Sequence, residues 1–154
     1  MGPDLTEVML EFSLRMALLK TIQEESQPLG DVSERDSVIL SLLDTKGAMT
    51  VSQITDLAPQ GSGSTISTTI TKLWKRKLVS KTIDPDNQRV TIVDLTGKGR
   101  EVVDVLNQQR AKRFQMFFDA INATKEEKEA LFRVFSKGVA FLDKQLSGIN
   151  SSQV

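Results

Sequence analysis

The chain has 154 residues, of which 39% are hydrophobic and 26% charged, and it contains no cysteine and no histidine. This length suits one domain with a helical extension and allows a sizeable core. Without cysteine and histidine the chain has no disulfide, no Cys/His zinc site and no Ser-His or Cys-His nucleophile pair. No apolar run approaches the roughly 18 residues of a membrane span, and the start lacks the pattern of a secretory signal. These absences exclude most catalytic chemistry and predict a protein without metal or cofactor.

The net charge is zero, but charge is distributed unevenly along the chain. Residues 1–56 carry ten acids and four bases, whereas residues 57–83 carry five bases and no acid. Residues 84–154 are nearly balanced, with eleven bases and ten acids. A window of 27 residues without a carboxylate predicts a surface for a polyanion. By charge alone, a solvated basic helix face is the simpler interpretation.

Residues 4–25 are predicted to form a long helix that is apolar on more than one side. Leu5, Val8 and Phe12 begin a stripe at helical spacing, and Leu10 and Leu18 widen it. A helix this apolar must be covered on more than one side, which a second chain can do. The breaker sequence Gln-Pro-Leu-Gly at 27–30 is expected to end it.

Two shorter helices are predicted next, each beginning with a capping box. Ser33 pairs with Asp36 at the first start, and Thr50 pairs with Gln53 at the second. A turn at residues 59–63 follows the second helix. The residues expected to be buried are Val38, Ile39, Leu42 and Leu43 in the first helix, and Val51, Ile54 and Leu57 in the second.

From Ser64 to about Lys77 a further helix is predicted, with apolar and polar residues on opposite faces. Such a Ser/Thr-rich helix is intrinsically poor, because hydroxyls compete for the backbone and β-branched side chains lose rotamers. Packing of the apolar stripe must therefore hold the helix, which leaves its polar face available to another molecule. The stripe is Ile66, Ile70, Leu73 and Trp74; the polar face is Ser64, Thr68, Thr71, Lys72 and Lys75, flanked by Thr65, Ser67, Thr69 and Arg76.

Two β-branched runs, Leu78–Ile83 and Arg89–Leu95, predict an antiparallel hairpin whose loop is residues 84–88. The predicted order is two short helices joined by a turn, the second of them basic, followed by a hairpin. This is the order of a winged helix-turn-helix. In helix-turn-helix docking the second helix enters the major groove of DNA, and the first braces against the backbone. The predicted fold class is therefore mainly α with a small β-hairpin wing.

Two long helices are expected after the hairpin. Thr96 caps a helix to about residue 121, and Thr124 with Glu127 opens another to about Leu146. The predicted organisation is an N-terminal dimerisation helix at 1–30, a winged helix-turn-helix lobe at 31–97, C-terminal dimerisation helices at 98–146 and a frayed tail at 147–154. The apolar stripes are Val102, Val103, Val105, Leu106, Phe114, Phe117, Phe118 and Ile121, then Leu131, Val134, Phe135, Phe141, Leu142 and Leu146.

The polar face of helix 64–77 is expected to contact DNA. Its hydroxyls discriminate only weakly between bases. Its first two turns hold no Asn, Gln or Arg for bidentate hydrogen bonds to a base. DNA shape and bridging water should then supply much of the specificity. Arg89 is placed to enter a narrow minor groove, with a salt bridge to Asp84 or Asp86 as the alternative. The predicted DNA-binding residues are Ser62, Ser64, Thr65, Ser67, Thr68, Thr71, Lys72, Lys75, Arg76, Lys81, Asn87, Gln88 and Arg89.

Several segments of residues 36–105 resemble the MarR family of bacterial and archaeal repressors. They are Met49-Thr50-Val51, Ser64-Thr65-Ile66-Ser67, Leu78-Val79, Asp84-Pro85-Asp86-Asn87-Gln88-Arg89, Val93-Asp94-Leu95-Thr96 and Gly99. The resemblance implies a cytoplasmic, nucleoid-associated homodimer that binds palindromic DNA and is often released by a small-molecule effector. By position it implies base or phosphate contacts at Ser67, Thr68 and Lys72, and a minor-groove arginine at Arg89.

The chain departs from the family pattern at three places. Asn87 stands where the wing usually has Asp, two residues before its arginine, and Lys77 stands where Gly commonly ends the recognition helix. The turn around residues 61–63 is about one residue longer than the common pattern.

A homodimer is predicted because the terminal helices are long and apolar, and six of the seven phenylalanines lie between 114 and 141. The resemblance implies an effector pocket lined by parts of residues 8–20, 38–46 and 100–114. The residues expected in the dimer interface are Leu5, Val8, Phe12, Phe117, Phe118, Phe135, Phe141 and Leu142.

Two other classes of function remain open. A winged-helix module that binds an acidic protein instead of DNA is consistent with the zero net charge. An enzyme is disfavoured because neither Gly61-Ser62-Gly63 nor Gly97-Lys98-Gly99 completes a phosphate-binding loop.

Overall fold

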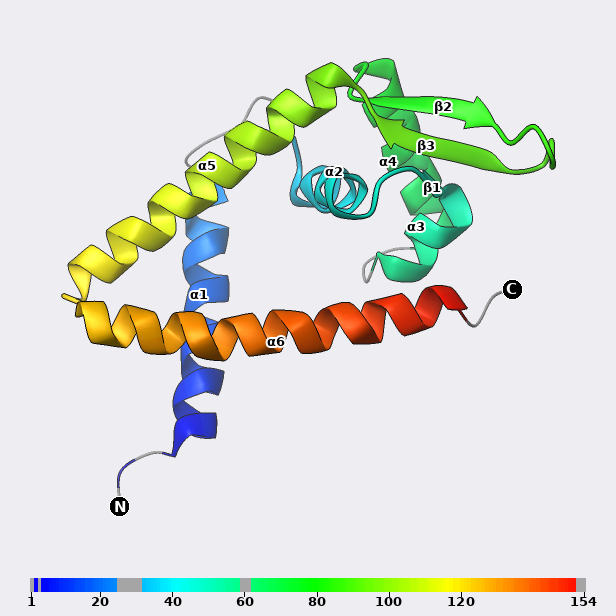
Figure 1. Ribbon diagram of the computed structural model, residues 1–154. Helices are drawn as coiled ribbons and strands as arrows, with labels where there is room; N and C mark the ends of the chain where they lie inside the picture. The colour runs from blue at the N-terminus through cyan, green and yellow to red at the C-terminus, as the bar shows by residue number, and fades with distance from the viewer. Residues whose placement is uncertain (1, 3, 25–31, 59–61, 152–154) are drawn as a thin grey trace. The chain divides into compact units, whose positions relative to one another are not determined.

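The computed structural model describes residues 2, 4–24, 32–58 and 62–151 (Figure 1). The chain divides into two compact units, residues 1–105 and 106–154. Its helices and strands confirm the predicted class, mainly α with a small antiparallel sheet. In chain order they are α1 (Leu5–Glu24), α2 (Glu34–Lys46), β1 (Met49–Thr50), α3 (Val51–Leu57), α4 (Gly63–Lys75), β2 (Val79–Ile83), β3 (Thr91–Leu95), α5 (Gly97–Ala120) and α6 (Lys125–Ser151).

The sheet has the order β1-β3-β2, with both pairs antiparallel. In β2 and β3, Val79 lies opposite Leu95 and Ile83 opposite Thr91, so the two strands form the predicted hairpin. Figure 1 shows this hairpin extending away from α2, α3 and α4 as a wing. The strand β1 was not predicted, because two residues show no periodicity of their own. It pairs Met49 with Val93 and so joins the helices to the wing.

The core of the first unit lies between α2, α3, α4 and the sheet. Fully buried side chains come from each of these elements and from the start of α5, where Val103 is 1% exposed. Burial of this apolar surface is the main force that holds the short helices together, since helices of 7 and 13 residues are marginal alone. The buried apolar residues of the cluster are Ile39, Leu40, Leu43, Met49, Ile54, Ile66, Ile70, Leu73, Leu78, Val79, Val93, Leu95 and Val103.

The predicted capping boxes are present. At α2 the Ser33 hydroxyl accepts from the Asp36 N–H, and the Asp36 carboxylate accepts from the Ser33 N–H at 2.9 Å. Thr50 with Gln53 at α3, and Thr124 with Glu127 at α6, make the same reciprocal bonds. These bonds satisfy amide groups that have no partner within a helix, which is why the helix starts are readable from sequence.

The predicted buried stripe of α2 was wrong at one position. Val38 is 38% exposed, whereas Leu40, which was not predicted, is fully buried. Of the buried positions, Asp36, Ile39, Leu40 and Leu43 have i, i+3, i+4, i+7 spacing, and Ser37 is buried beside them. Val38 therefore lies one helical step away from the centre of the buried face.

Helix α4 begins one residue before the predicted start and ends at Lys75. The hydroxyls of Thr68 and Thr69 each donate a hydrogen bond to the backbone carbonyl four residues earlier, at 2.9 Å. Thr69 is buried, although it was predicted to flank the polar face. Because its hydroxyl is satisfied by the backbone, its burial with Ile66, Ile70 and Leu73 costs little.

The second unit contains most of α5 and α6, whose apolar side chains are largely exposed in the single chain. On α6 the predicted stripe residues Val134 and Phe135 are 66% and 65% exposed. On α5, Phe117 and Phe118 are half-buried, and their rings meet edge to face at 5.9 Å. Helix α6 continues to Ser151, beyond the predicted end at Leu146.

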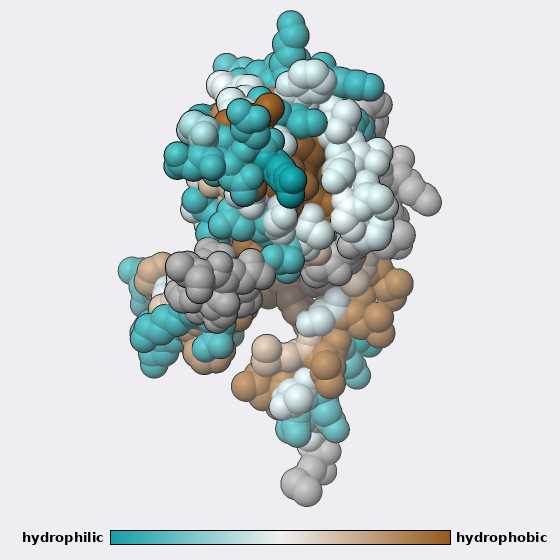
Figure 2. All heavy atoms as spheres, turned by 90° about the vertical axis from the view of Figure 1, so that its right-hand side faces the viewer, coloured by the Kyte–Doolittle hydropathy of each residue, from teal (hydrophilic) through white to brown (hydrophobic). Residues whose placement is uncertain are grey.

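Helix α1 also carries exposed apolar side chains, among them Leu5, Val8 and Phe12. In Figure 2 brown, apolar atoms cover much of α1 in the lower part of the view. The breaker predicted at 27–30 and the first part of the turn at 59–63 lie outside the described residues. Within the described segments, no helix has the length and apolar character that a membrane span requires.

Candidate nucleic-acid interface

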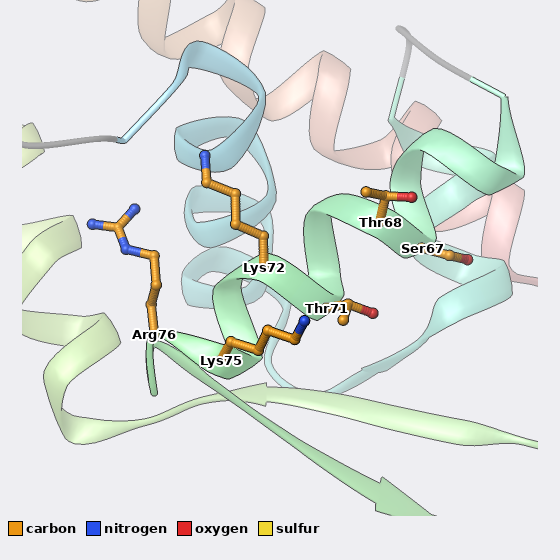
Figure 3. Close-up of a pocket in the computed structure, with 6 residues that line it drawn as sticks. All are labelled: Ser67, Thr68, Thr71, Lys72, Lys75 and Arg76. Atoms are coloured by element: carbon orange, nitrogen blue, oxygen red, sulfur yellow. The ribbon is translucent and has the colours of Figure 1, made fainter.

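The outward face of α4 lines an open groove of about 510 Å³. The buried stripe on the opposite side fixes the orientation of the helix, so the polar side chains face away from the core. Figure 3 shows these side chains on successive turns of α4. The lining residues are Ser67, Thr68, Thr71, Lys72, Lys75 and Arg76, all of which were predicted to contact DNA.

Hydroxyl groups cluster at the start of α4. The Ser62 hydroxyl lies 2.8 Å from that of Ser64 and 3.1 Å from that of Thr65. Ser62 is the N-cap residue, but its side chain makes no capping bond. The Thr68 hydroxyl donates its hydrogen bond to the Ser64 carbonyl, so its oxygen can act towards a ligand only as an acceptor. This end of the helix therefore presents short polar groups and no charge.

Cationic groups occupy the C-terminal half of the groove. Lys75 is exposed, and Arg76 is half-buried at the C-cap. No acid occurs between Asp56 and Asp84 in the sequence. The arrangement gives a polar surface that becomes positive along the helix, which suits a polyanion with hydrogen-bonding edges.

Lys72 has a partner that the sequence did not reveal. Its ammonium donates to the Asp36 carboxylate on α2 at 2.8 Å, and in Figure 3 its side chain extends towards α2. The Lys72 side chain is 46% exposed, whereas that of Asp36 is 2% exposed. The prediction that Lys72 simply faces outward is therefore revised, because its charged end is held by a second helix.

Trp74 was predicted to be buried and is 48% exposed. The buried face uses Thr69 instead, together with the predicted Leu73, which leaves Trp74 at the edge of the apolar face. The ammonium of Lys81 on β2 lies over its ring, 5.3 Å from the centroid, in a cation–π contact. This contact places the Lys81 charge beside the C-terminal half of α4.

Two Asx turns organise the loop of the wing, each with an Asp or Asn side chain that accepts from the backbone N–H two residues later. The Asp84 side chain accepts from the Asp86 N–H at 2.8 Å, and the Asn87 side chain accepts from the Arg89 N–H at 3.2 Å. Among the described residues, no ion pair joins Arg89 to either aspartate. Arg89 and Val90 lie before β3, which starts at Thr91 rather than at the predicted Arg89. The Arg89 side chain is exposed at the end of the loop, as are Asn87 and Gln88.

The described residues contain no cluster of three or more acidic, histidine or cysteine side chains that could hold a metal ion. They also leave no buried polar side-chain atom without a hydrogen-bond partner.

Two helices joined by a turn, with the second presenting a polar and basic face next to a β-hairpin, define a winged helix-turn-helix domain. Residues 32–91 match the model of the MarR family. This match confirms the resemblance found in the sequence.

Solved structures with the same fold cover nearly the whole chain. BpsR of Bordetella bronchiseptica, described with the regulation of its DNA binding by 6-hydroxynicotinic acid, is 23% identical, with a TM-score of 0.59 over 85% of this chain and 98% of its own. PcaV of Streptomyces coelicolor, solved with its natural ligand, is 18% identical, with a TM-score of 0.61 over 91% and 97%. A MepR mutant of S. aureus bound to an oligodeoxyribonucleotide is 20% identical, with a TM-score of 0.59 over 92% and 99%. No curated protein matches the sequence.

The structure thus brings six of the predicted residues at α4 into one groove and places Lys81 beside Trp74, while Ser64 and Thr65 lie with Ser62 at the start of the helix. Sequence reasoning missed two residues that contact the side chains of this surface, the buried Asp36 and the exposed Trp74. Asp36 was visible only as a helix cap, because its partner Lys72 is 36 residues away. Trp74 has helical spacing from Ile66 and Ile70, and only the packing of Thr69 shows that it is not in the core.

Proposed function

We propose that this protein is a homodimeric transcriptional regulator, acting as a repressor, that binds double-stranded DNA at palindromic sites. The observation that carries the proposal is the groove on α4. A helix anchored by Ile66, Ile70 and Leu73 presents hydroxyls, then cations, with no acid among them. Such a helix supplies both backbone contacts and contacts to base edges.

In this proposal α4 lies in the major groove and the wing reaches the adjacent minor groove. The hydroxyls of Ser67, Thr68 and Thr71 face base edges, and Lys75 and Arg76 contact phosphates. Arg89 enters the minor groove, whose negative potential is strongest where it is narrow. The exposed position of Arg89 at the end of the wing supports this role.

We infer that two copies of the chain assemble through the terminal helices. A single helix-turn-helix covers one half-site, and a two-fold dimer reads two of them. Exposed apolar side chains on α1, α5 and α6 support a second chain as their cover, because monomers seldom expose so many. The predicted interface residues keep their assignment: Leu5, Val8, Phe12, Phe117, Phe118, Phe135, Phe141 and Leu142.

A small molecule is proposed to release the protein from DNA. The related folds BpsR and PcaV are described with small-molecule ligands, which supports the same kind of control here. A ligand can act in this way only if it binds one spacing of the two recognition helices better than the other.

Selection of bound sequences from random double-stranded DNA at fixed salt tests the proposal. We expect enrichment of a palindrome whose half-sites are about 34–36 Å apart or a multiple of that distance. Enrichment of a single unpaired half-site would contradict the dimer, and a pool that stays random would contradict sequence-specific binding.

The alternative is a winged-helix module whose basic face binds an acidic protein. Salt dependence separates the two: the logarithm of the DNA affinity should fall linearly with the logarithm of salt, by about 0.9 per phosphate neutralised. Lys75→Gln should reduce this slope by about one such unit. Lys112→Gln, an exposed lysine of α5 outside the groove, is the matched control and should leave the slope unchanged.

A further inference from the structure

Asp36 is a buried carboxylate that the proposed DNA contacts do not use. Its side chain is 2% exposed, and its Oδ2 atom accepts from both the Ser33 N–H, at 2.9 Å, and the Lys72 ammonium, at 2.8 Å. A buried charge is costly unless it is paired and hydrogen-bonded. The start of α2 and the lysine of α4 together meet that requirement.

The same contact fixes the position of the lysine. A free lysine side chain has four rotatable bonds, and holding it in one place on binding costs conformational entropy. Here the ammonium is already held at the edge of the groove that Lys72 lines. The Lys72 side chain nevertheless stays 46% exposed, so a molecule in the groove can reach it.

We propose that Asp36 is a positioning residue for DNA binding, which holds the Lys72 ammonium between α2 and the groove so that it donates to a DNA phosphate. The inference rests on the proposed function and extends it to a residue that does not itself face DNA. The phosphate then meets a lysine whose position the protein has already fixed.

The sign of one mutational effect separates this proposal from ordinary electrostatics. Removing a carboxylate near a DNA-binding surface weakens repulsion of the phosphates, which by itself strengthens binding. If Asp36 positions Lys72, its removal weakens binding in spite of the more positive surface. Asp36→Asn is suitable because an asparagine oxygen still accepts from the Ser33 N–H and so preserves the cap of α2, while the loss of the negative charge weakens its hold on the Lys72 ammonium.

The experiment measures binding of the full chain to a fluorescently labelled duplex obtained from the selection, over a series of salt concentrations. We expect Asp36→Asn to lower the affinity by about tenfold, as for loss of one well-placed charged contact. Asp44→Asn is the matched control: it removes the same charge from an exposed position of α2 and should leave the affinity unchanged or slightly higher. Tighter binding by Asp36→Asn would overturn the proposal.

A second pair of variants excludes a purely structural role. Lys72→Met should lower the affinity and reduce the salt slope by about 0.9, because one phosphate contact is lost. In the Lys72→Met background, Asp36→Asn should have no further effect on affinity, and this double variant leaves no unpaired buried charge. An equal loss in both backgrounds, or an unchanged slope in Lys72→Met, would show that Asp36 acts only through the fold. Failure of the unmodified chain to bind any duplex would instead overturn the proposed function itself, and this inference with it.

Discussion

At the scale of single residues, Asn87 at the end of the wing determines how Arg89 is supported. Asn87 stands where related wings usually have aspartate, and its carboxamide accepts from the Arg89 backbone N–H at 3.2 Å. The loop therefore orders the backbone of Arg89, while its guanidinium extends from an exposed residue. A side chain supported in this way can adjust to the width of a groove.

Replacing Arg89 by alanine should weaken DNA binding according to the sequence that flanks the half-site. We expect a loss of about tenfold on A·T-rich flanks, where the minor groove is narrow and attracts arginine, and a smaller loss on G·C-rich flanks. Binding of the full chain to two duplexes that differ only in their flanks measures this. Thr82→Ala, at an exposed position of the wing outside the predicted contacts, is the control and should leave the affinity unchanged. Equal losses of Arg89→Ala on both duplexes would identify Arg89 as a phosphate contact only.

At the scale of elements, the end of α4 explains why related chains favour glycine at the position of Lys77. Lys77 has φ of 62°, in the left-handed region. Its N–H donates to the Trp74 carbonyl at 2.9 Å, and the Leu78 N–H donates to the Leu73 carbonyl at 3.0 Å. These two bonds form a Schellman motif, which directs the chain from the helix into β2. The motif persists with lysine because Leu73 and Leu78 are both buried.

Lys77→Gly should therefore raise the free energy of unfolding, by about 0.5–1 kcal/mol. Glycine adopts the left-handed conformation without the steric cost of a Cβ, although it also gains entropy in the unfolded chain, which limits the effect. Denaturant unfolding of the two proteins measures the difference. Lys77→Ala keeps a Cβ and should give no comparable gain, and a gain as large as that of glycine would show that the lysine charge, not the backbone, is responsible.

The start of α5 is joined closely to the end of α4. The Thr96 N–H and hydroxyl donate to the carbonyls of Leu78 and Lys77, at 3.1 and 2.6 Å, and the Thr96 hydroxyl accepts from the Gly99 N–H. A Cβ on Gly99 would lie only 2.0 Å from the Leu78 carbonyl oxygen. The helix that leaves the winged helix-turn-helix lobe thus approaches it at a distance that only glycine permits.

Gly99→Ala should destabilise the protein by about 1–3 kcal/mol, because the backbone of either Leu78 or α5 must move. Gly97→Ala is a matched control in the same helix turn, since nothing lies within 4 Å of the Cβ it would add. Thermal or denaturant unfolding measures both variants. Equal stability of the two would contradict the close approach.

At the scale of the whole molecule, the single chain leaves much apolar surface exposed outside the lobe. Leu5 on α1 is 75% exposed, and Phe132 on α6 is 73% exposed. Within the lobe, by contrast, the large apolar residues of α4 other than Trp74 are almost fully buried. This difference indicates that the terminal helices are completed by assembly rather than by the chain itself.

Light scattering at micromolar concentration should therefore give a mass of twice 17.1 kDa. Phe135→Glu places a charge on the apolar stripe of α6 and should shift the protein towards monomer or unfold it. Lys137→Glu changes an exposed position of the same helix and should leave the mass unchanged. A monomeric unmodified chain would contradict the dimer.

Short-range features were determined by the sequence itself. The three capping boxes, the hairpin and the apolar side of α4 each depend on residues a few positions apart, whose geometry is fixed by helix and strand periods. For this reason helical spacing alone places Ser67, Thr68, Thr71, Lys75 and Arg76 together on the polar side of α4.

Only the tertiary structure decided what depends on distant residues. The pairing of β1 with β3 joins Met49 to Val93, and the partner of Lys72 is Asp36, 36 residues earlier. The choice of Thr69 rather than Trp74 for the core was settled by the packing of α4 against α2, α3 and the sheet. Periodicity gives the direction in which a side chain points, but its partner depends on which elements pack there, and that is a property of the folded chain.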